Sequence, residues 1–204
     1  MLLKMLINRL NYRFKLLILK LIQKIRIYFF KLVSTANVKG CPTLSQPLHA
    51  VGSGVIQFEG TVNVGIFPSP YFLSSYAYME ARNLGSSIFI GDGSFLNNGF
   101  TAIAEFSDIY IGRRVLVGTN VEIFDSNFHG LEVDQRNITN RDQSKSVTIG
   151  DDVFLGSNVK ISKGVTIGRG SIIANGSIVV KNVPEFTIAG GNPAVILGML
   201  KNDN

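Results

Sequence analysis

Residues 149–180, IGDDVFLGSNVKISKGVTIGRGSIIANGSIVV, decide the fold of this chain. In this stretch an aliphatic residue followed by a small or permissive one returns every six residues, at Ile149, Leu155, Ile161, Ile167, Ile173 and Val179. A period of six matches neither the turn of an α-helix nor the simple alternation of a strand. It is typical of a solenoid in which each hexapeptide forms one side of a triangular coil, so that a turn takes about 18 residues. The repeat therefore predicts a mainly β protein, a parallel β-helix whose aliphatic side chains point inward and stack from coil to coil.

The same phase continues upstream with two interruptions. The step from Ile90 to Ile111 is 21 residues, one coil plus three, which predicts a small bulge at residues 102–110. The step from Ile123 to Ile149 is 26 residues, one coil plus eight, so we expect a loop to leave the prism at residues 125–147.

Length and composition fit one solenoid domain with an N-terminal appendage, since the chain has 204 residues and is 46% apolar. We predict an amphipathic basic helix at residues 1–34, irregular early coils with an aromatic insertion at 35–89, the regular β-helix at 90–183, and a C-terminal cap and tail at 184–204. The single cysteine, Cys41, excludes an intrachain disulfide and favours a reducing compartment, so a cytoplasmic protein is expected.

The net charge of +6 comes from the N-terminal segment. Residues 1–33 contain eight lysines and arginines and no acid, which leaves 12 basic against 14 acidic side chains, a net of −2, for the remainder. An apolar stripe of helical spacing runs through this segment, with a ridge of cations beside it. The stripe is Leu3, Ile7, Leu10, Phe14, Leu17, Leu21, Ile25, Tyr28 and Leu32, and the ridge is Arg9, Arg13, Lys20, Lys24 and Lys31.

This pattern predicts a helix at residues 1–33 that lies on an anionic membrane surface, which would place the protein peripherally at the inner face of the plasma membrane. The alternative is that the stripe packs on the β-helix or on a neighbouring subunit. The longest apolar run in the segment is four residues, too short for a membrane span or a signal peptide. Nucleic acid is not expected as a partner, because no binding motif accompanies the charge.

The repeat, the stretch SIIANGSIVVKNVP at residues 171–184 and the ending AGGNPA at residues 189–194 together resemble the hexapeptide-repeat acyltransferases. More narrowly, they are similar to the branch of maltose and galactoside O-acetyltransferases, which includes polysaccharide O-acetyltransferases. This resemblance covers roughly residues 88–197 and implies a left-handed β-helix, usually a homotrimer. It also implies an acetyltransferase that uses acetyl-CoA and acts on a sugar hydroxyl in a cell-surface polysaccharide or its lipid-linked precursor.

His129 is the predicted general base. It ends the sequence DSNFH, residues 125–129, where the chain leaves the prism, and matches the position of the catalytic histidine in the family. Imidazole is well suited to take a proton from a hydroxyl at neutral pH. The only other histidine, His49, is expected to be a surface or packing residue, so we expect neither the three-histidine zinc site known in this architecture nor another metal.

The resemblance implies two further catalytic residues. Asn97 matches an active-site asparagine suited to orient the acceptor or to donate to the oxyanion, although asparagine also commonly turns β-helix corners. Glu105 matches an acidic position and could bind the acceptor or orient His129, from the same or an adjacent subunit. Asp125 could orient His129 or cap the loop, and the sequence leaves both roles open.

The resemblance also places the acetyl-CoA slot, at Phe154, Ser157, Asn175, Val180 and Lys181. Lys181 could meet a phosphate as a point charge. Where better-matched members of the family carry arginines, this chain has Val195 and Gly198, which leaves the phosphate contacts open.

The sequence specifies neither the acceptor sugar nor the hydroxyl that is acylated. Two alternatives to O-acetyl transfer stay open: acetyl transfer to an amine, such as that of an amino sugar nucleotide, and a non-catalytic β-helix that serves as a scaffold.

Overall fold

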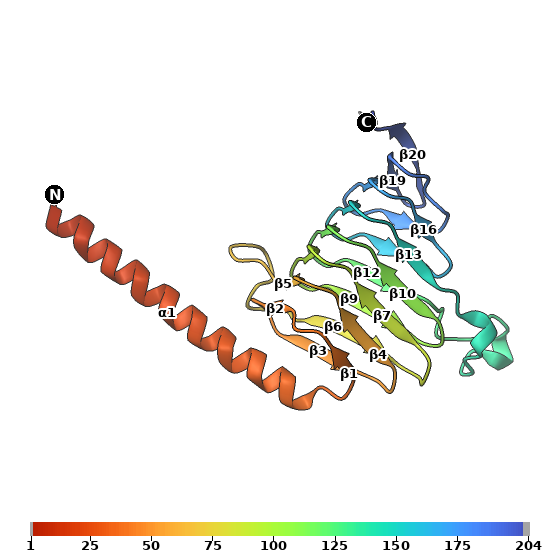
Figure 1. Ribbon diagram of the computed structural model, residues 1–204, viewed down its shortest axis with the longest axis horizontal. Helices are drawn as coiled ribbons and strands as arrows, with labels where there is room; N and C mark the ends of the chain where they lie inside the picture. The colour runs from red at the N-terminus through yellow and green to blue at the C-terminus, as the bar shows by residue number, and fades with distance from the viewer. Residues whose placement is uncertain (1, 202–204) are drawn as a thin grey trace.

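A computed structural model describes the backbone of residues 2–201 and the side chains of residues 11–201. The chain begins with one long helix, α1 (Leu2–Val33), and continues as a three-sided β-helix (Figure 1). A hairpin of β19 (Thr187–Gly191) and β20 (Ala194–Met199) forms its C-terminal end. The structure confirms the mainly β fold and the N-terminal helix that the sequence predicts.

Successive strands go in turn to three sheets, which form the three sides of the prism. Sheet A contains β1 (Asn37–Lys39), β4 (Val55–Phe58), β7 (Ser87–Ile90), β10 (Asp108–Ile111), β13 (Val147–Ile149) and β16 (Thr166–Ile167). Sheet B contains β2 (Thr43–Leu44), β5 (Asn63–Val64), β8 (Phe95–Leu96), β11 (Leu116–Val117), β14 (Phe154–Leu155), β17 (Ile172–Ile173), β19 and β20. Sheet C contains β3 (Leu48–Val51), β6 (Ala77–Ala81), β9 (Thr101–Ala104), β12 (Glu122–Phe124), β15 (Lys160–Ile161) and β18 (Ile178–Val179). Neighbouring strands are parallel, except for β19 and β20.

Aliphatic side chains form columns inside the prism because the parallel register places each one over its counterpart in the next coil. In sheet A, Ile88 pairs with Ile109, and Ile109 with Val147, and all three are completely buried. Burial of each such side chain contributes about 1.5–3 kcal/mol. The corners must be narrow: a Cβ on Gly118 would lie 2.5 Å from the backbone nitrogen of Ser157. The six-residue rhythm is therefore the spacing of the inward positions.

The coils begin earlier, and more regularly, than the sequence suggests. Strands β1 and β4 pair in register with β7, so residues 35–89 do not form the irregular coils that we expected. An insertion at residues 65–76, which carries four aromatic side chains, separates β5 from β6 and conceals the period. The side chain of Asn98 holds this insertion, since it donates to the carbonyl groups of Ile66 and Pro70 at 3.0 and 2.8 Å.

The predicted three-residue bulge is the turn between β9 and β10. The backbone amides of Glu105, Phe106 and Ser107 donate to the carboxylate of Asp125 at 2.8, 3.1 and 2.8 Å. Asp125 lies one coil further along and is completely buried. Its carboxylate therefore caps the turn of the preceding coil, which is neither of the roles that the sequence left open, orientation of His129 or capping of the loop.

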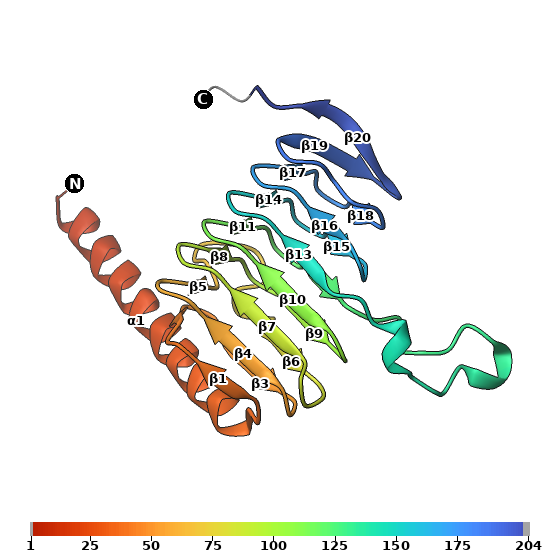
Figure 2. The ribbon, with the colours of Figure 1, turned by 45° about the vertical axis from the view of Figure 1, so that its right-hand side comes forward.

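The residues between β12 and β13 form a loop that projects from the prism (Figure 2). Because β13 follows β12 as the next side of the prism, no further coil lies between Ile123 and Ile149, and the loop is larger than the eight-residue excess that we expected. The amide of Lys145 donates to the carbonyl of Asp125 at 2.8 Å and closes the base of the loop. Its two short 3-10 helices, η1 (Val133–Gln135) and η2 (Arg141–Gln143), contain no buried residue. The loop thus keeps the stacking of the coils intact on either side.

The C-terminal half of α1 packs on the first coils and on the insertion. Gln23 is buried, and its amide donates to the carbonyl of Phe72 at 2.9 Å. Arg26 donates to the same carbonyl at 3.3 Å. The rings of Phe30 and His49 lie 5.5 Å apart, which confirms His49 as a packing residue. Polar anchors and one aromatic cluster therefore fix the helix to the β-helix.

We predict that Asp125→Ala lowers the free energy of unfolding by about 3 kcal/mol, because one buried and two partly buried amides lose a charged acceptor. Urea denaturation of the two proteins measures the difference. Asp134→Ala, in the exposed part of the same loop, is the matched control and should behave as wild type. Equal midpoints for Asp125→Ala and the control would contradict the capping role.

Candidate active site

His129 lies at the start of the projecting loop, with an exposed side chain. Its ring nitrogen Nδ1 is 2.8 Å from the carbonyl oxygen of Gly130. Because a carbonyl oxygen can only accept, Nδ1 carries the proton of the neutral ring in this contact. Nε2 is then the unprotonated nitrogen. This contact leaves Nε2 of the neutral imidazole able to accept a proton.

Phe128 fixes the backbone that presents His129. It has a positive φ of 62°, an unusual conformation for a large residue, and its amide donates to the hydroxyl of Ser126 at 3.0 Å. The ring meets Phe124 edge-on, with centroids 5.6 Å apart. The guanidinium of Arg82 lies over the ring of Phe128, 4.8 Å from its centroid, in a cation–π contact.

Arg82 is held in turn by two carboxylates, one on strand β6 of sheet C and one in the turn after β9. Its Nε and Nη1 atoms donate to Glu80 at 2.7 Å and to Glu105 at 3.0 Å. Burial would raise the pKa of Glu80, but hydrogen bonds from Arg82 and Tyr78 lower it below its ordinary value. Burial, followed by the hydrogen bond to Glu80, raises the pKa of Tyr78 to about 12. Glu80 is therefore an ionised partner of Arg82, and Tyr78 beside it stays neutral.

Glu105 is 98% shielded from solvent, with 2% of its surface exposed. One carboxylate oxygen binds Arg82, and the other, Oε2, is buried without a hydrogen-bond partner among the described residues. The structure shows no hydrogen bond from Glu105 or Asp125 to His129. Glu105 contacts the arginine that supports Phe128, so its connection to His129 is indirect.

Asn97 and its neighbour Asn98 occupy the corner between sheets B and C. The side-chain oxygen of Asn97 accepts the amide of Asn98 at 2.8 Å, which is turn chemistry, and the side chain is half-buried. The parallel register aligns Asn98, and not Asn97, with Ser157 and Asn175. This bond uses only the side-chain oxygen of Asn97, and its side-chain nitrogen can donate to another group.

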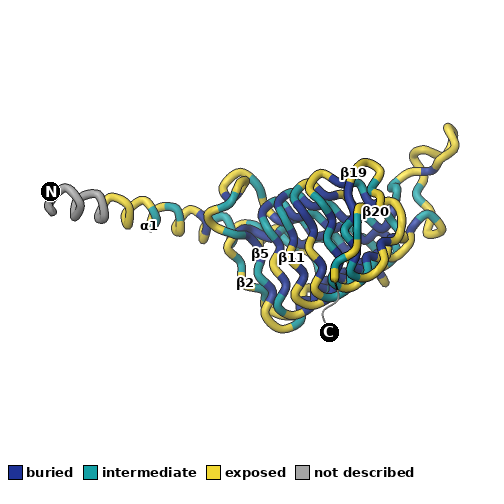
Figure 3. The backbone as a smooth tube through the Cα atoms, turned by 90° about the horizontal axis from the view of Figure 1, so that it is seen from above, coloured by how far each residue is buried: buried dark blue, intermediate teal, exposed yellow. Residues whose placement is uncertain are grey.

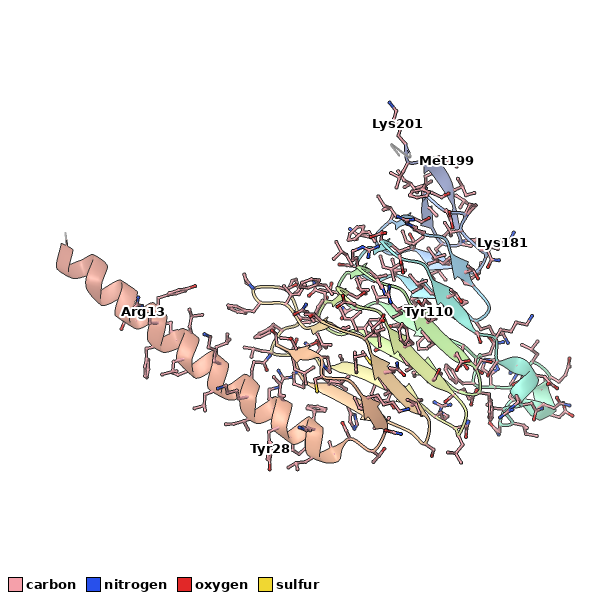
Figure 4. The ribbon with its side chains drawn as sticks, viewed as in Figure 1. Arg13, Tyr28, Tyr110, Lys181, Met199 and Lys201 are labelled. Carbon is pink, nitrogen blue, oxygen red and sulfur yellow. The ribbon has the colours of Figure 1, made fainter. Side chains whose placement is uncertain are left out.

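The predicted cofactor residues fall into two groups. Phe154, Ser157 and Asn175 lie on sheet B or at its corner with sheet C. The side-chain oxygen of Asn175 accepts the amide of Ser157 at 2.8 Å, so these two residues also connect adjacent coils. Val180 and Lys181 follow β18 at the opposite edge of sheet C, where Lys181 points outward (Figure 4).

The predicted site residues therefore gather at two corners of the prism. Asn97, Phe154, Ser157 and Asn175 lie along the corner of sheets B and C, whereas Glu105, His129, Val180 and Lys181 lie along the corner of sheets C and A. Sheet C separates the two groups. Arg82 and Phe128 are not among the residues that the sequence predicts for the site, although Phe128 stands directly before the predicted base.

Comparison with known proteins agrees with the repeat and the fold. The family model for the bacterial transferase hexapeptide (six repeats) matches residues 146–181. The hexapeptide-repeat containing acetyltransferase VCA0836 from Vibrio cholerae is 26% identical, with 88% of this chain and 82% of that chain covered and a TM-score of 0.55. The structure of the same protein complexed with acetyl coenzyme A, from Vibrio cholerae O1 biovar eltor, covers 90% of this chain and 84% of its own, at 26% identity and a TM-score of 0.55.

The polySia-specific acetyltransferase NeuO shares the fold at 24% identity, with 82% of this chain and 71% of that chain covered and a TM-score of 0.56. The three-sided parallel coils thus form a left-handed β-helix of the acetyltransferase type. By its repeat and its fold, the chain is similar to the hexapeptide-repeat acetyltransferases.

Proposed function

We propose that this chain transfers an acetyl group from acetyl-CoA to a sugar hydroxyl of a cell-surface polysaccharide or its lipid-linked precursor. The observation that carries the proposal is the exposed imidazole of His129, whose Nδ1 contact with Gly130 leaves Nε2 as a proton acceptor. Acetyl-CoA as the donor is supported by the VCA0836 complex, whose protein shares both the repeat and the fold. Acetyltransferases are the consistent class among the compared structures.

The proposed reaction uses His129 twice. Nε2 accepts the proton of the sugar hydroxyl while its oxygen attacks the thioester carbonyl carbon, and a tetrahedral oxyanion forms. When the intermediate collapses, the carbon–sulfur bond breaks and the imidazolium returns the proton to the departing thiolate of coenzyme A. The free amide nitrogen of Asn97 is the proposed donor to the oxyanion or the acceptor sugar. Metal ligands are not required by this scheme.

The two groups of site residues support a homotrimer. Within one chain, sheet C lies between His129 and the group that contains Asn97 and Phe154. A second copy could place its own Asn97 and Phe154 next to His129 of the first. The outer face of sheet B also carries an apolar row in which Phe95, Leu116 and Phe154 are 40, 49 and 42% exposed. Such a row is suited to burial between subunits or beneath a pantetheine arm.

For the cofactor we propose that Phe154, Ser157 and Asn175 line the slot, with Val180 and Lys181 approaching it from a neighbouring copy. Lys181 is exposed and could bind a phosphate. Val195 of β20 is 59% exposed and supplies no charge. In this proposal Lys181 is therefore the residue that binds a phosphate of acetyl-CoA.

His129→Ala should lower turnover of acetyl-CoA with its acceptor by about a hundredfold or more, the loss expected for a general base. Thiol release is measured with hydroxyl sugars, amino sugars, nucleotide sugars and lipid-linked saccharides. Leu131→Ala, also in the loop and 73% exposed, is the control and should keep wild-type turnover.

The acceptor panel also separates the alternatives. Turnover restricted to amino sugars would replace the O-acetyl proposal by N-acetyl transfer. Failure to bind acetyl-CoA in calorimetry would favour a scaffold. If free sugars are acetylated as well as lipid-linked ones, the lipid-linked acceptor is excluded.

Arg82→Met should lower kcat by about tenfold while KM for acetyl-CoA stays unchanged, because the loss acts on the support of His129 and not on the cofactor slot. Steady-state kinetics at saturating acceptor test this positioning role. Arg114→Met removes an arginine that pairs with Asp152 on the surface and should be neutral. Equal losses in both variants would contradict a specific role for Arg82.

Coexpressed His129→Ala and Asn97→Ala chains should recover about a quarter of wild-type turnover if each site takes one residue from each of two subunits, since random assembly then restores that share of sites. The two variants alone should be nearly inactive. Differently tagged chains allow mixed trimers to be purified. Turnover no higher than that of the separate variants would place a complete site within one chain.

A further inference from the structure

Helix α1 has two apolar faces on opposite sides. One face contacts the β-helix and the insertion through partly or fully buried side chains, including Leu16, Leu19, Gln23, Ile27 and Phe30. At about 100° per residue, these positions fall within one side of the helix. The stripe predicted from the sequence is on the other side, so the helix does not use that stripe to pack on its own chain.

The second face is left exposed along the described part of the helix. Tyr28 points away from the strands (Figure 4), and the helix extends well past the β-helix with most of its described surface exposed (Figure 3). The apolar side chains of this face are between 42 and 65% exposed: Phe14, Leu17, Ile18, Leu21, Ile22, Ile25, Tyr28, Phe29, Leu32 and Val33. Leu3, Ile7, Leu10 and Arg9 of the predicted pattern lie outside the residues whose side chains are described.

A row of cations borders the exposed apolar face on one flank. Arg13, Lys20, Lys24 and Lys31 share this flank at helical spacing, and all four are exposed. Within residues 11–33 the helix contains no Asp or Glu. Among the described residues, none of these four cations forms an ion pair with an acid of the β-helix.

We propose that the second face of α1, defined by the ten exposed apolar residues named above, docks on an anionic lipid surface. An apolar face bordered by cations matches an interface in which acyl chains lie beneath negatively charged headgroups. The β-helix is attached to the opposite face of α1 and therefore stays on the water side. This inference concerns a surface separate from the proposed active site and holds whatever the acceptor is.

Charge argues against a second copy of α1 as the occupant. Two such faces packed together would bring rows of lysine and arginine close to each other, with no acidic side chain in the segment to compensate. Anionic headgroups supply the missing negative charge. In the described residues no helix has the length and apolarity to cross a bilayer, so the proposed contact is with the surface.

The test measures binding of the full chain to vesicles of phosphatidylcholine alone or with about a third phosphatidylglycerol. Wild type should prefer the anionic vesicles. Replacement of Arg13, Lys20, Lys24 and Lys31 by glutamine should weaken binding about a hundredfold or more, at roughly fivefold per cation. The matched control replaces four exposed cations outside the helix by glutamine: Lys39, Arg136, Arg141 and Lys201.

Leu21→Ser with Ile25→Ser tests the apolar contribution, which should cost about tenfold or more per side chain. Both residues are exposed, so circular dichroism and melting should be unchanged. Equal binding to neutral and anionic vesicles, or equal losses in the cation variant and its control, would overturn the proposal. So would a fall in oligomer mass of Leu21→Ser/Ile25→Ser by light scattering without lipid, because the face would then join copies of the chain.

Discussion

The rest of the structure depends on the stacking of inward aliphatic side chains from coil to coil. Ile109 must lie over Ile88 and beneath Val147, and the parallel hydrogen bonds of sheet A hold that register. Residues in excess of a coil cannot enter the column without displacing it, because the interior is packed. They leave at corners, and this is why the insertion after β5, the turn after β9 and the loop after β12 all lie outside the prism.

The turn after β9 and the loop after β12 leave the prism at the same corner in consecutive coils. As a result, residues far apart in the sequence support the backbone next to the candidate base, His129. Asp125, where the loop begins, caps the turn that contains Glu105. Glu105 binds Arg82 from the coil before, and Arg82 stacks on Phe128 next to His129. Three successive coils thus contribute to one support. A histidine on a loop without such contacts would lose more conformational entropy when it meets the acceptor.

Sequence spacing predicts what depends on local register and misses what depends on contacts between coils. The bulge follows from the step between Ile90 and Ile111, and the loop from the step between Ile123 and Ile149, since each excess shifts the phase of the aliphatic residues. The early coils escape this count because their inward positions include Ala77 and Met79, which a search for branched aliphatics passes over, and because an insertion conceals the period. The support by Arg82 joins residues far apart in the chain, so no local pattern marks it.

The helix shows how one basic amphipathic segment can pack on its own chain and still leave its apolar stripe exposed. A basic amphipathic segment could pack on its own chain or bind a membrane, and a single apolar stripe could serve only one of these purposes. Here the packing face is anchored by Gln23 and Arg26, whose hydrogen bonds reach the carbonyl of Phe72. These polar contacts hold the helix on the β-helix, and the apolar stripe stays exposed. Since burial of that stripe against the β-helix would have hidden it, the use of the opposite face is what keeps Leu21 and Ile25 exposed.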